Sequence, residues 1–260
     1  MIFILPANPS HRFGLLMLYL KFQSIANKIF SMQNRTEQFL NDPVFPLLIR
    51  MSAPNTIAFF IQAIVVLAEV WFISKLGTTS LAAVALAFPI IMLTQQMAFG
   101  ALGGAVSSSI ARSLGAEDKE RAEKLLWHSL LLSCCGYFFF FLIFFTGGES
   151  VLMALGGEGS LLEESLLYIK IFLAGAIFIW LSGTLSAALR GIGNMRFPAL
   201  LMILGSGIQV VLAGGLILGW FGLPKLGIIG APLSAISVAA FMSIVMIFKF
   251  MHSSSNVQLK

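Results

Sequence analysis

Residues 57–74 read IAFFIQAIVVLAEVWFIS, a run of eighteen positions with one acidic residue and no basic residue. A hydrocarbon core of about 30 Å is crossed by roughly twenty residues of α-helix. In lipid every backbone N–H and C=O group must be satisfied within the chain, and this run lacks the period-two alternation of a membrane β-barrel strand. The stretch therefore predicts a transmembrane α-helix.

The whole chain repeats this pattern. Of its 260 residues 58% are hydrophobic and 10% are charged, and the mean hydropathy is +0.94. A soluble domain of this length could not bury so many apolar residues in one core. Six long apolar runs can be counted, at about residues 47–74, 81–110, 125–145, 166–189, 198–221 and 227–250. The predicted fold class is an all-α membrane protein with six transmembrane helices. Pro54 and Pro89 lie inside the first two runs and predict bends there.

The charged residues between the runs indicate the topology. Basic residues accompany alternate connections on one side: Arg35, Arg50, Arg112, Lys119, Arg121, Lys124, Arg190, Arg196, Lys249 and Lys260. The opposite connections carry only Lys75 and Lys225, and the one between the third and fourth runs is acidic, with Glu149, Glu158, Glu163 and Glu164. By the positive-inside rule we expect a multi-pass protein of the plasma (inner) membrane with both termini cytoplasmic. Because the basic residues are scattered rather than gathered with aromatics, no nucleic-acid partner is expected.

The sequence also predicts the structure of the segments outside and between the apolar runs. Residues 1–42 are predicted to be a cytoplasmic tail, either a start-site extension before Met32 or an amphipathic surface segment, and residues 253–260 a polar tail. The mixed charges of residues 115–124 predict a solvated helix that links the second and third spans. The glycines at 100–104 and 214–215 favour close helix packing; the alternative is a broken helix at a transport site.

Enzymatic chemistry finds little support in the sequence. There is no HExxH, no P-loop and no Cys/His metal pattern, so no enzyme activity and no bound cofactor or metal is expected. Cys134 and Cys135 are adjacent within an apolar run, which favours small lipid-facing or bundle-facing residues over a disulfide. The histidines His11, His128 and His252 lie near span ends or in tails.

Glu69 is the one acidic residue well inside an apolar run. A charged carboxylate at depth costs roughly 2.5–3.5 kcal/mol or more, so the side chain should face the bundle interior, be protonated much of the time, or both. These are the properties of a site that binds and releases a proton or cation. The alternative is an acid wetted at the membrane surface, since Lys75 follows only six residues later.

Polar side chains on other runs could complete a cavity lining. Gln62 lies two helical turns before Glu69 on the same face. The remaining candidates are Gln95 and Gln96 in the second run and Ser206 and Gln209 in the fifth. Each amide or hydroxyl alone is more often an interhelical hydrogen bond than a ligand contact.

Four segments together resemble one known family. They are residues 69–83 (EVWFISKLGTTSLAA), 111–118 (ARSLGAED), 189–198 (LRGIGNMRFP) and 226–235 (LGIIGAPLSA). In this order they resemble the MATE (multidrug and toxic compound extrusion) transporters, over about residues 43–250. The resemblance implies export of organic, often cationic, compounds driven by inward H⁺ or Na⁺, with alternating access between two six-helix lobes. Residues 43–252 would form the amino-terminal lobe.

The resemblance also assigns a coupling site, with gaps. Glu69 falls where the family usually has an aspartate whose protonation or cation binding is coupled to transport, and Gln209 where it usually has an asparagine, with Ser206 beside it. Ala213 and Ala235 fall where some members have an aspartate and a threonine. A single carboxyl with amide neighbours suits H⁺ better than a multi-oxygen Na⁺ cage. Gln62, Gln95 and Gln96 are the candidates for the substrate cavity.

The length departs from the family, whose complete members have about twelve helices. The chain is then a fragment, or pairs with a second six-helix lobe or a second copy as a homodimer, or no longer transports. The alternative function is therefore a non-transporting membrane protein or assembly partner. A lipid-linked-sugar flippase would need several basic residues in the cavity, and Lys170 is the only candidate.

Overall fold

The computed structural model of the protein describes residues 43–252, so the predictions for the tails at 1–42 and 253–260 lie outside the described residues. The chain divides into two compact units, residues 1–52 and 53–260. Of the first unit, residues 43–52 are described, and they form the first turns of helix α2. All that follows concerns the second unit.

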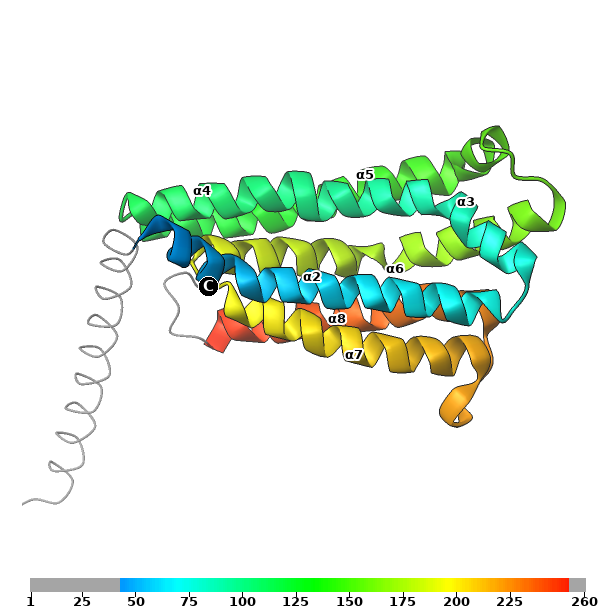
Figure 1. The fold of residues 1–260 in the computed structure, drawn as a ribbon. Helices are drawn as coiled ribbons and strands as arrows, with labels where there is room; N and C mark the ends of the chain where they lie inside the picture. Colours follow the sequence, from blue (N-terminus) through cyan, green and yellow to red (C-terminus); the bar gives the residue numbers. More distant parts are fainter. Residues whose placement is uncertain (1–42, 253–260) are drawn as a thin grey trace, which may run out of the picture. The chain divides into compact units, whose positions relative to one another are not determined.

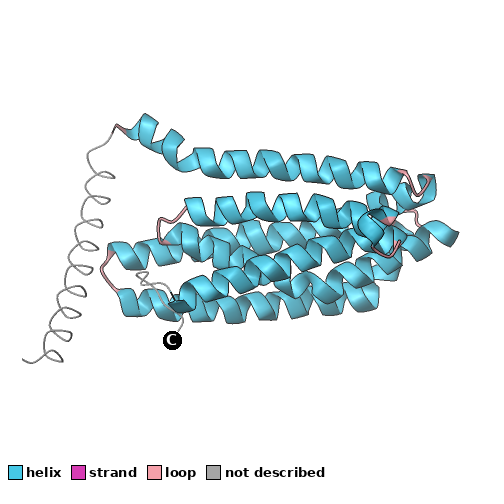
Figure 2. Cartoon of the chain, turned by 90° about the horizontal axis from the view of Figure 1, so that it is seen from below, coloured by secondary structure: helices cyan, strands magenta, loops and turns pink. Residues whose placement is uncertain are grey.

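The described residues are almost entirely helical and contain no strand (Figures 1 and 2). The elements are α2 (Val44–Ser74), α3 (Thr78–Gln95), η1 (Gln96–Leu102), α4 (Gly103–Gly115), α5 (Lys119–Ala154), α6 (Gly159–Gly191), α7 (Arg196–Leu218), η2 (Trp220–Gly222), η3 (Gly227–Ile229) and α8 (Gly230–His252). Together they provide six helices long and apolar enough to cross a membrane, because α3, η1 and α4 run on as one helix, Thr78–Gly115. The predicted six-helix, all-α fold is confirmed.

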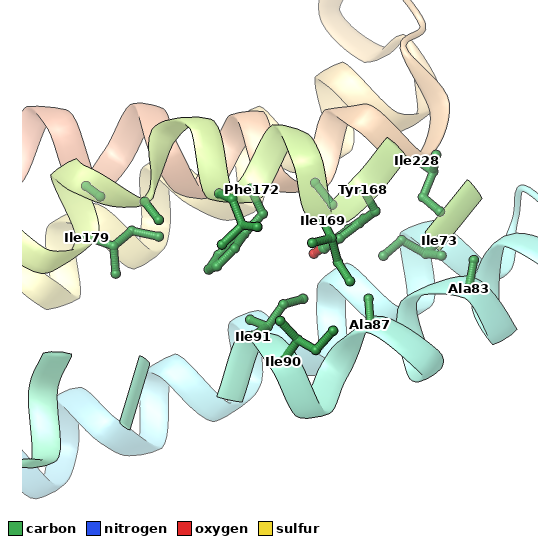
Figure 3. Packing of buried hydrophobic residues seen from close by; sticks show 14 of the residues in the cluster. Ile73, Ala83, Ala87, Ile90, Ile91, Tyr168, Ile169, Phe172, Ile179 and Ile228 are labelled. Carbon is green, nitrogen blue, oxygen red and sulfur yellow. The ribbon is translucent and has the colours of Figure 1, made fainter. Parts of the chain in front are cut away.

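Helix α6 lies at the centre of the bundle and packs against α3, α4, α5 and α8. Figure 3 shows Tyr168, Phe172 and Ile179 of α6 in the apolar cluster that also includes Ile90 and Ile91 of α3. Small residues let the neighbouring helices approach closely. A Cβ atom on Gly175 would lie 2.5 Å from the side chain of Ile236 in α8, and one on Gly191 would lie 2.7 Å from the Ser107 carbonyl oxygen in α4.

The second span is continuous but not uniformly α-helical. Residues Gln96–Leu102 form π-helical turns between α3 and α4, a feature often found at functional sites. The ring of Phe99 in this segment packs against Gly183 of α6, where a Cβ atom would be 3.2 Å from the ring. The glycines at 100–104 therefore belong to an unbroken helix, and the alternative of a broken helix is wrong for this span.

The charged segment 115–124 is organised differently from the prediction. Helix α4 ends at Gly115 and α5 begins at Lys119, so the charged residues from Lys119 onward form the first turns of α5, and the segment is not a separate linking helix. The chain turns at Glu117, whose φ is 60°, and the Asp118 side chain caps α5 by accepting a hydrogen bond from the Arg121 N–H at 2.9 Å. A cap at Asp118 favours starting the long helix at that point.

A buried hydroxyl pair joins α5 to α6, and its loss should be measurable. Thr184 Oγ1 donates to Ser133 Oγ at 3.0 Å, and both side chains are fully buried. Interhelical hydrogen bonds in membranes contribute about 0.6 to 2 kcal/mol. We expect Thr184→Val to lower the free energy of unfolding in mixed micelles by about that amount. Thr146→Val, whose exposed hydroxyl bonds only to carbonyls of its own helix, should change it less.

Candidate functional site

Three polar side chains of helix α2 form a stripe along the helix. Asn55, Gln62 and Glu69 are spaced by seven residues, which is about two helical turns, so they share one face. Next to this stripe Ala58, Val65 and Phe72 repeat with the same spacing and are buried. The same side of α2 therefore offers both apolar packing and hydrogen-bonding groups to the bundle.

The Glu69 side chain is partly buried and meets α7. Gln209 Nε2 donates a hydrogen bond to Glu69 Oε1 at 2.8 Å, and Gln209 is 9% exposed. Ser234 of α8 also lies near the carboxyl, and its hydroxyl donates a hydrogen bond to the Ala231 carbonyl at 2.8 Å. Among the side chains that the structure describes, no cation forms an ion pair with it. The hydrogen-bond partner of the carboxyl group is thus a neutral amide.

One helical turn toward the Arg196 end of α7, a second polar contact joins the same two helices. Ser206 Oγ donates to Gln62 Oε1 at 3.1 Å. Ser206 and Gln209 are three residues apart and so lie on one face of α7. The structure thus brings together four of the six predicted site residues, from segments about 140 positions apart, and their role in a cavity stays a prediction.

The other two predicted residues lie elsewhere. Gln95 ends α3 and Gln96 begins the π-helical segment, and neither amide forms a hydrogen bond with a described residue of α2 or α7. Gln96 is exposed and Gln95 is partly buried. The structure does not join them to Glu69, and their role toward a substrate stays a prediction.

The sequence reasoning missed two parts of this region. Asn55 extends the polar stripe, with its Nδ2 atom 3.9 Å from the sulfur of Met195, and the seven-residue period was the signal for it. An aromatic group joins Trp71 and Phe72, which follow Glu69 in α2, with Trp220 of η2. Nothing in the linear sequence connects Trp220 with Phe72, because they are far apart along the chain.

A neutral hydrogen-bonded setting determines what the site can do chemically. A carboxyl group without a counter-ion, held among apolar helices, exchanges between a protonated form and a charged form that needs a cation or water. Among the described residues there is no group of three His, Cys, Asp or Glu side chains that could hold a metal ion. The chemistry available is the binding and release of one proton or one monovalent cation.

Six apolar helices, with an acidic side chain of one helix hydrogen-bonded to another, are the features of a multi-pass membrane protein. Residues 54–214 match the family model named MatE, and the chain belongs to this family. The resemblance seen in the four sequence segments is thereby confirmed. Members of this family are transporters rather than enzymes.

Known proteins agree with this assignment. The chain is 30% identical over 197 residues to the "FAD transporter" of Shewanella oneidensis, a match that covers 76% of this chain and 43% of that protein. It is 26% identical over 189 residues to the "Probable multidrug resistance protein NorM" of Thermotoga maritima, covering 73% and 40%. A solved structure described as "Crystal structure of MATE P26A mutant" matches with a TM-score of 0.77 and 31% identity over 85% of this chain and 49% of that one. The chain spans less than half the length of these curated relatives.

Proposed function

We propose that the chain forms the amino-terminal lobe of a cation-coupled antiporter that exports organic compounds across the plasma membrane. The observation that carries the proposal is the Glu69 carboxyl, held by Gln209 at 2.8 Å between α2 and α7. In this position the charged carboxylate has a much higher free energy than the neutral, protonated carboxyl. That difference can favour one arrangement of α2 against α7 over another, which is what coupling requires.

The coupling ion in this proposal is H⁺. Sodium prefers several oxygen ligands, and the two further positions where relatives of the family can supply oxygen hold Ala213 and Ala235 here. Ala213 is fully buried, one helical turn beyond Gln209. The remaining oxygens near the site belong to one carboxyl, one amide and neighbouring hydroxyls, a set that supports proton binding.

The substrate class follows from the family. Similar proteins are named as multidrug resistance proteins, and one is named as an FAD transporter. We therefore propose small organic compounds, cationic ones first, with Gln62, Gln95 and Gln96 as residues of the substrate cavity. Both termini face the cytoplasm in this proposal, since the basic residues Arg112, Arg190 and Arg196 then lie on the cytoplasmic side.

The proposal also requires a second lobe, because alternating access needs two bundles that move against each other. The matched relatives are more than twice as long as the matched segment, which supports a second six-helix lobe. This lobe would come from additional sequence, from another chain or from a second copy in a homodimer. A lobe without such a partner would be the alternative: a membrane protein that packs in the bilayer without transport.

Efflux from vesicles tests the proposal. The chain is reconstituted with a fluorescent organic cation inside, and an acid-outside pH gradient or an inward Na⁺ gradient is imposed; a flavin dinucleotide is tested in parallel. We expect the pH gradient to accelerate efflux above that of protein-free vesicles and the Na⁺ gradient to have little effect. Efflux equal to that of protein-free vesicles under both gradients would contradict transport by this chain and favour the alternative.

A further inference from the structure

Three aromatic side chains close the Lys75 end of the contact between α2 and α7. The ring centroids of Phe72 and Trp220 are 5.4 Å apart, those of Trp71 and Phe72 5.4 Å, and those of Trp71 and Trp220 6.3 Å. Phe72 is 5% exposed, whereas Trp71 and Trp220 are about half exposed. The two indoles thus face outward and cover the phenyl ring beneath them.

The order of contacts along α2 and α7 places this group directly beyond the carboxyl. Phe72 follows Glu69 by three residues, which is about 4.5 Å along the helix and on the same face. On α7, Gly214 follows Gln209 by five residues, about 7.5 Å in the same direction. From the Arg196 end toward the Lys75 end, the two helices therefore meet through Gln62 and Ser206, then Glu69 and Gln209, then the aromatic group.

Gly214 of α7 is the residue against which Trp220 and Phe72 pack. A Cβ atom on Gly214 would lie 2.9 Å from Trp220 Cε3 and 3.3 Å from Phe72 Cζ, so only glycine leaves room for both rings. The indole of Trp220 reaches Gly214 because the chain reverses direction after α7, where Gly219 has a φ of 80° and Phe221 a φ of 58°. The Leu226 N–H bonds to the Leu216 carbonyl at 2.8 Å and closes the turn. A backbone reversal held in this way positions Trp220 over the helix that it has just left.

An aromatic residue at a membrane surface is usually an interfacial anchor, and the half-exposed Trp71, with Lys75 Nζ 5.0 Å from its ring centroid, fits that role. Trp220 differs, because Cε3 and Cζ3 of its indole lie against Gly214 of α7 and its ring meets the buried Phe72 of α2 in an edge arrangement. Trp220 therefore covers the contact between α2 and α7, whereas an interfacial anchor lies on the side of a single helix.

We propose that Phe72 and Trp220 form a lid that closes the α2–α7 contact on the Lys75 side and separates the Glu69 carboxyl from water on that side of the membrane. The inference rests on the proposed function, in which this carboxyl carries the coupling proton. Trp220 is a positioning residue in this scheme, since it touches neither substrate nor proton. Opening the lid requires the indole to leave Gly214.

Water access beneath the lid can be measured with a cysteine at Ala213. This alanine is fully buried, precedes Gly214 and belongs to the same apolar cluster as Phe72. The reporter chain carries Ala213→Cys with Cys134→Ser and Cys135→Ser. A membrane-impermeant thiosulfonate is added separately to each face of oriented vesicles, and the labelling rate is followed with Trp220 present, with Trp220→Phe and with Trp220→Ala.

We expect Trp220→Ala to raise the labelling rate from the Lys75 side by a factor of ten or so, with no rise from the opposite face. Trp220→Phe keeps a ring on Gly214 and should stay near the parent rate. Phe72→Ala removes the other half of the lid and should reproduce the rise if Trp220→Ala is poorly folded. Trp127→Ala, which removes a half-exposed indole from α5, is the matched control and should leave the rate unchanged.

Equal labelling rates for the parent and both lid variants would overturn the lid. A rise of the same size in Trp127→Ala, or from the opposite face, would also overturn it, because it would show general loosening. Labelling reports water access and requires no transport. If these rates contradict the lid, the proposed role of Glu69 in proton coupling is unaffected. If Glu69 has no such role, the efflux measurements show it and the labelling rates do not change.

Discussion

Replacing Glu69 by Gln is expected to reduce gradient-driven efflux to the level of protein-free vesicles while leaving membrane insertion unchanged. Glutamine has nearly the same shape, and its amide oxygen can still accept the hydrogen bond that Gln209 donates to Glu69 Oε1 at 2.8 Å. What is lost is the exchangeable proton. Because the amide stays neutral under all conditions, the gradient can no longer bias one arrangement of α2 and α7 over the other.

Two variants complete this experiment. Glu163→Gln removes an exposed acid from the first turns of α6 and should retain the parent rate. Glu69→Asp keeps the carboxyl with a side chain one methylene shorter, and we expect it to retain part of the coupled efflux. Rates are measured with and without the pH gradient, and amounts in the membrane are compared by blotting. Undiminished gradient-driven efflux by Glu69→Gln would refute the role assigned to this residue.

Replacing Gly230 by Ala should produce the largest structural effect of a single methyl group in this chain. Gly230 begins α8 against α7, and a Cβ atom there would lie 2.6 Å from the Leu216 carbonyl carbon, 2.7 Å from the Ile217 nitrogen and 2.8 Å from the Leu216 oxygen. All three are backbone atoms, so no side-chain rotation relieves the overlap and the two helices must separate. We expect the free energy of unfolding to fall by about 1–3 kcal/mol.

Gly207→Ala is the matched control in α7. No atom lies within 4 Å of a Cβ built at Gly207, so the methyl group meets open space. Alanine is the better helix former by up to about 1 kcal/mol, and the expected change is neutral or stabilising. Both variants are unfolded in mixed micelles under the same conditions. Equal stabilities of Gly230→Ala and the parent would show that α8 can shift away from α7 at no cost.

The acid at the centre of the site was predictable from sequence because its signal is local. Glu69 stands among apolar neighbours, and the cost of a charge in lipid makes such a residue conspicuous without knowledge of its partners. Ser206 and Gln209 were identifiable as polar residues in a later span. The family resemblance placed both in one coupling site with Glu69. Which atoms pair, and the contact of Ser206 with Gln62, could not be predicted, because hydrogen bonds between helices depend on helix rotation and depth, which the apolar runs leave free.

The charged segment at 115–124 and the π-helical turns at Gln96–Leu102 show the same limit. Mixed charges indicated a solvated helix, but whether it stands alone or continues α5 depended on where the cap at Asp118 forms. The π-helical turns need no particular residue type and do not interrupt the apolar pattern, so the sequence does not predict them. They are visible only through contacts such as Phe99 on Gly183.

By itself, the sequence determined that this protein is six membrane-spanning helices with one acid well inside a span, because runs of about twenty apolar residues must be helical in lipid whatever surrounds them. The tertiary structure alone decided which side chains meet. The contacts of Glu69 with Gln209, and of Phe72 with Trp220 over Gly214, depend on where two distant helices touch. Close packing at small residues such as Gly175 and Gly230 likewise sets how near α6, α7 and α8 approach one another, a non-local property in which a single methyl group changes the distance between helices.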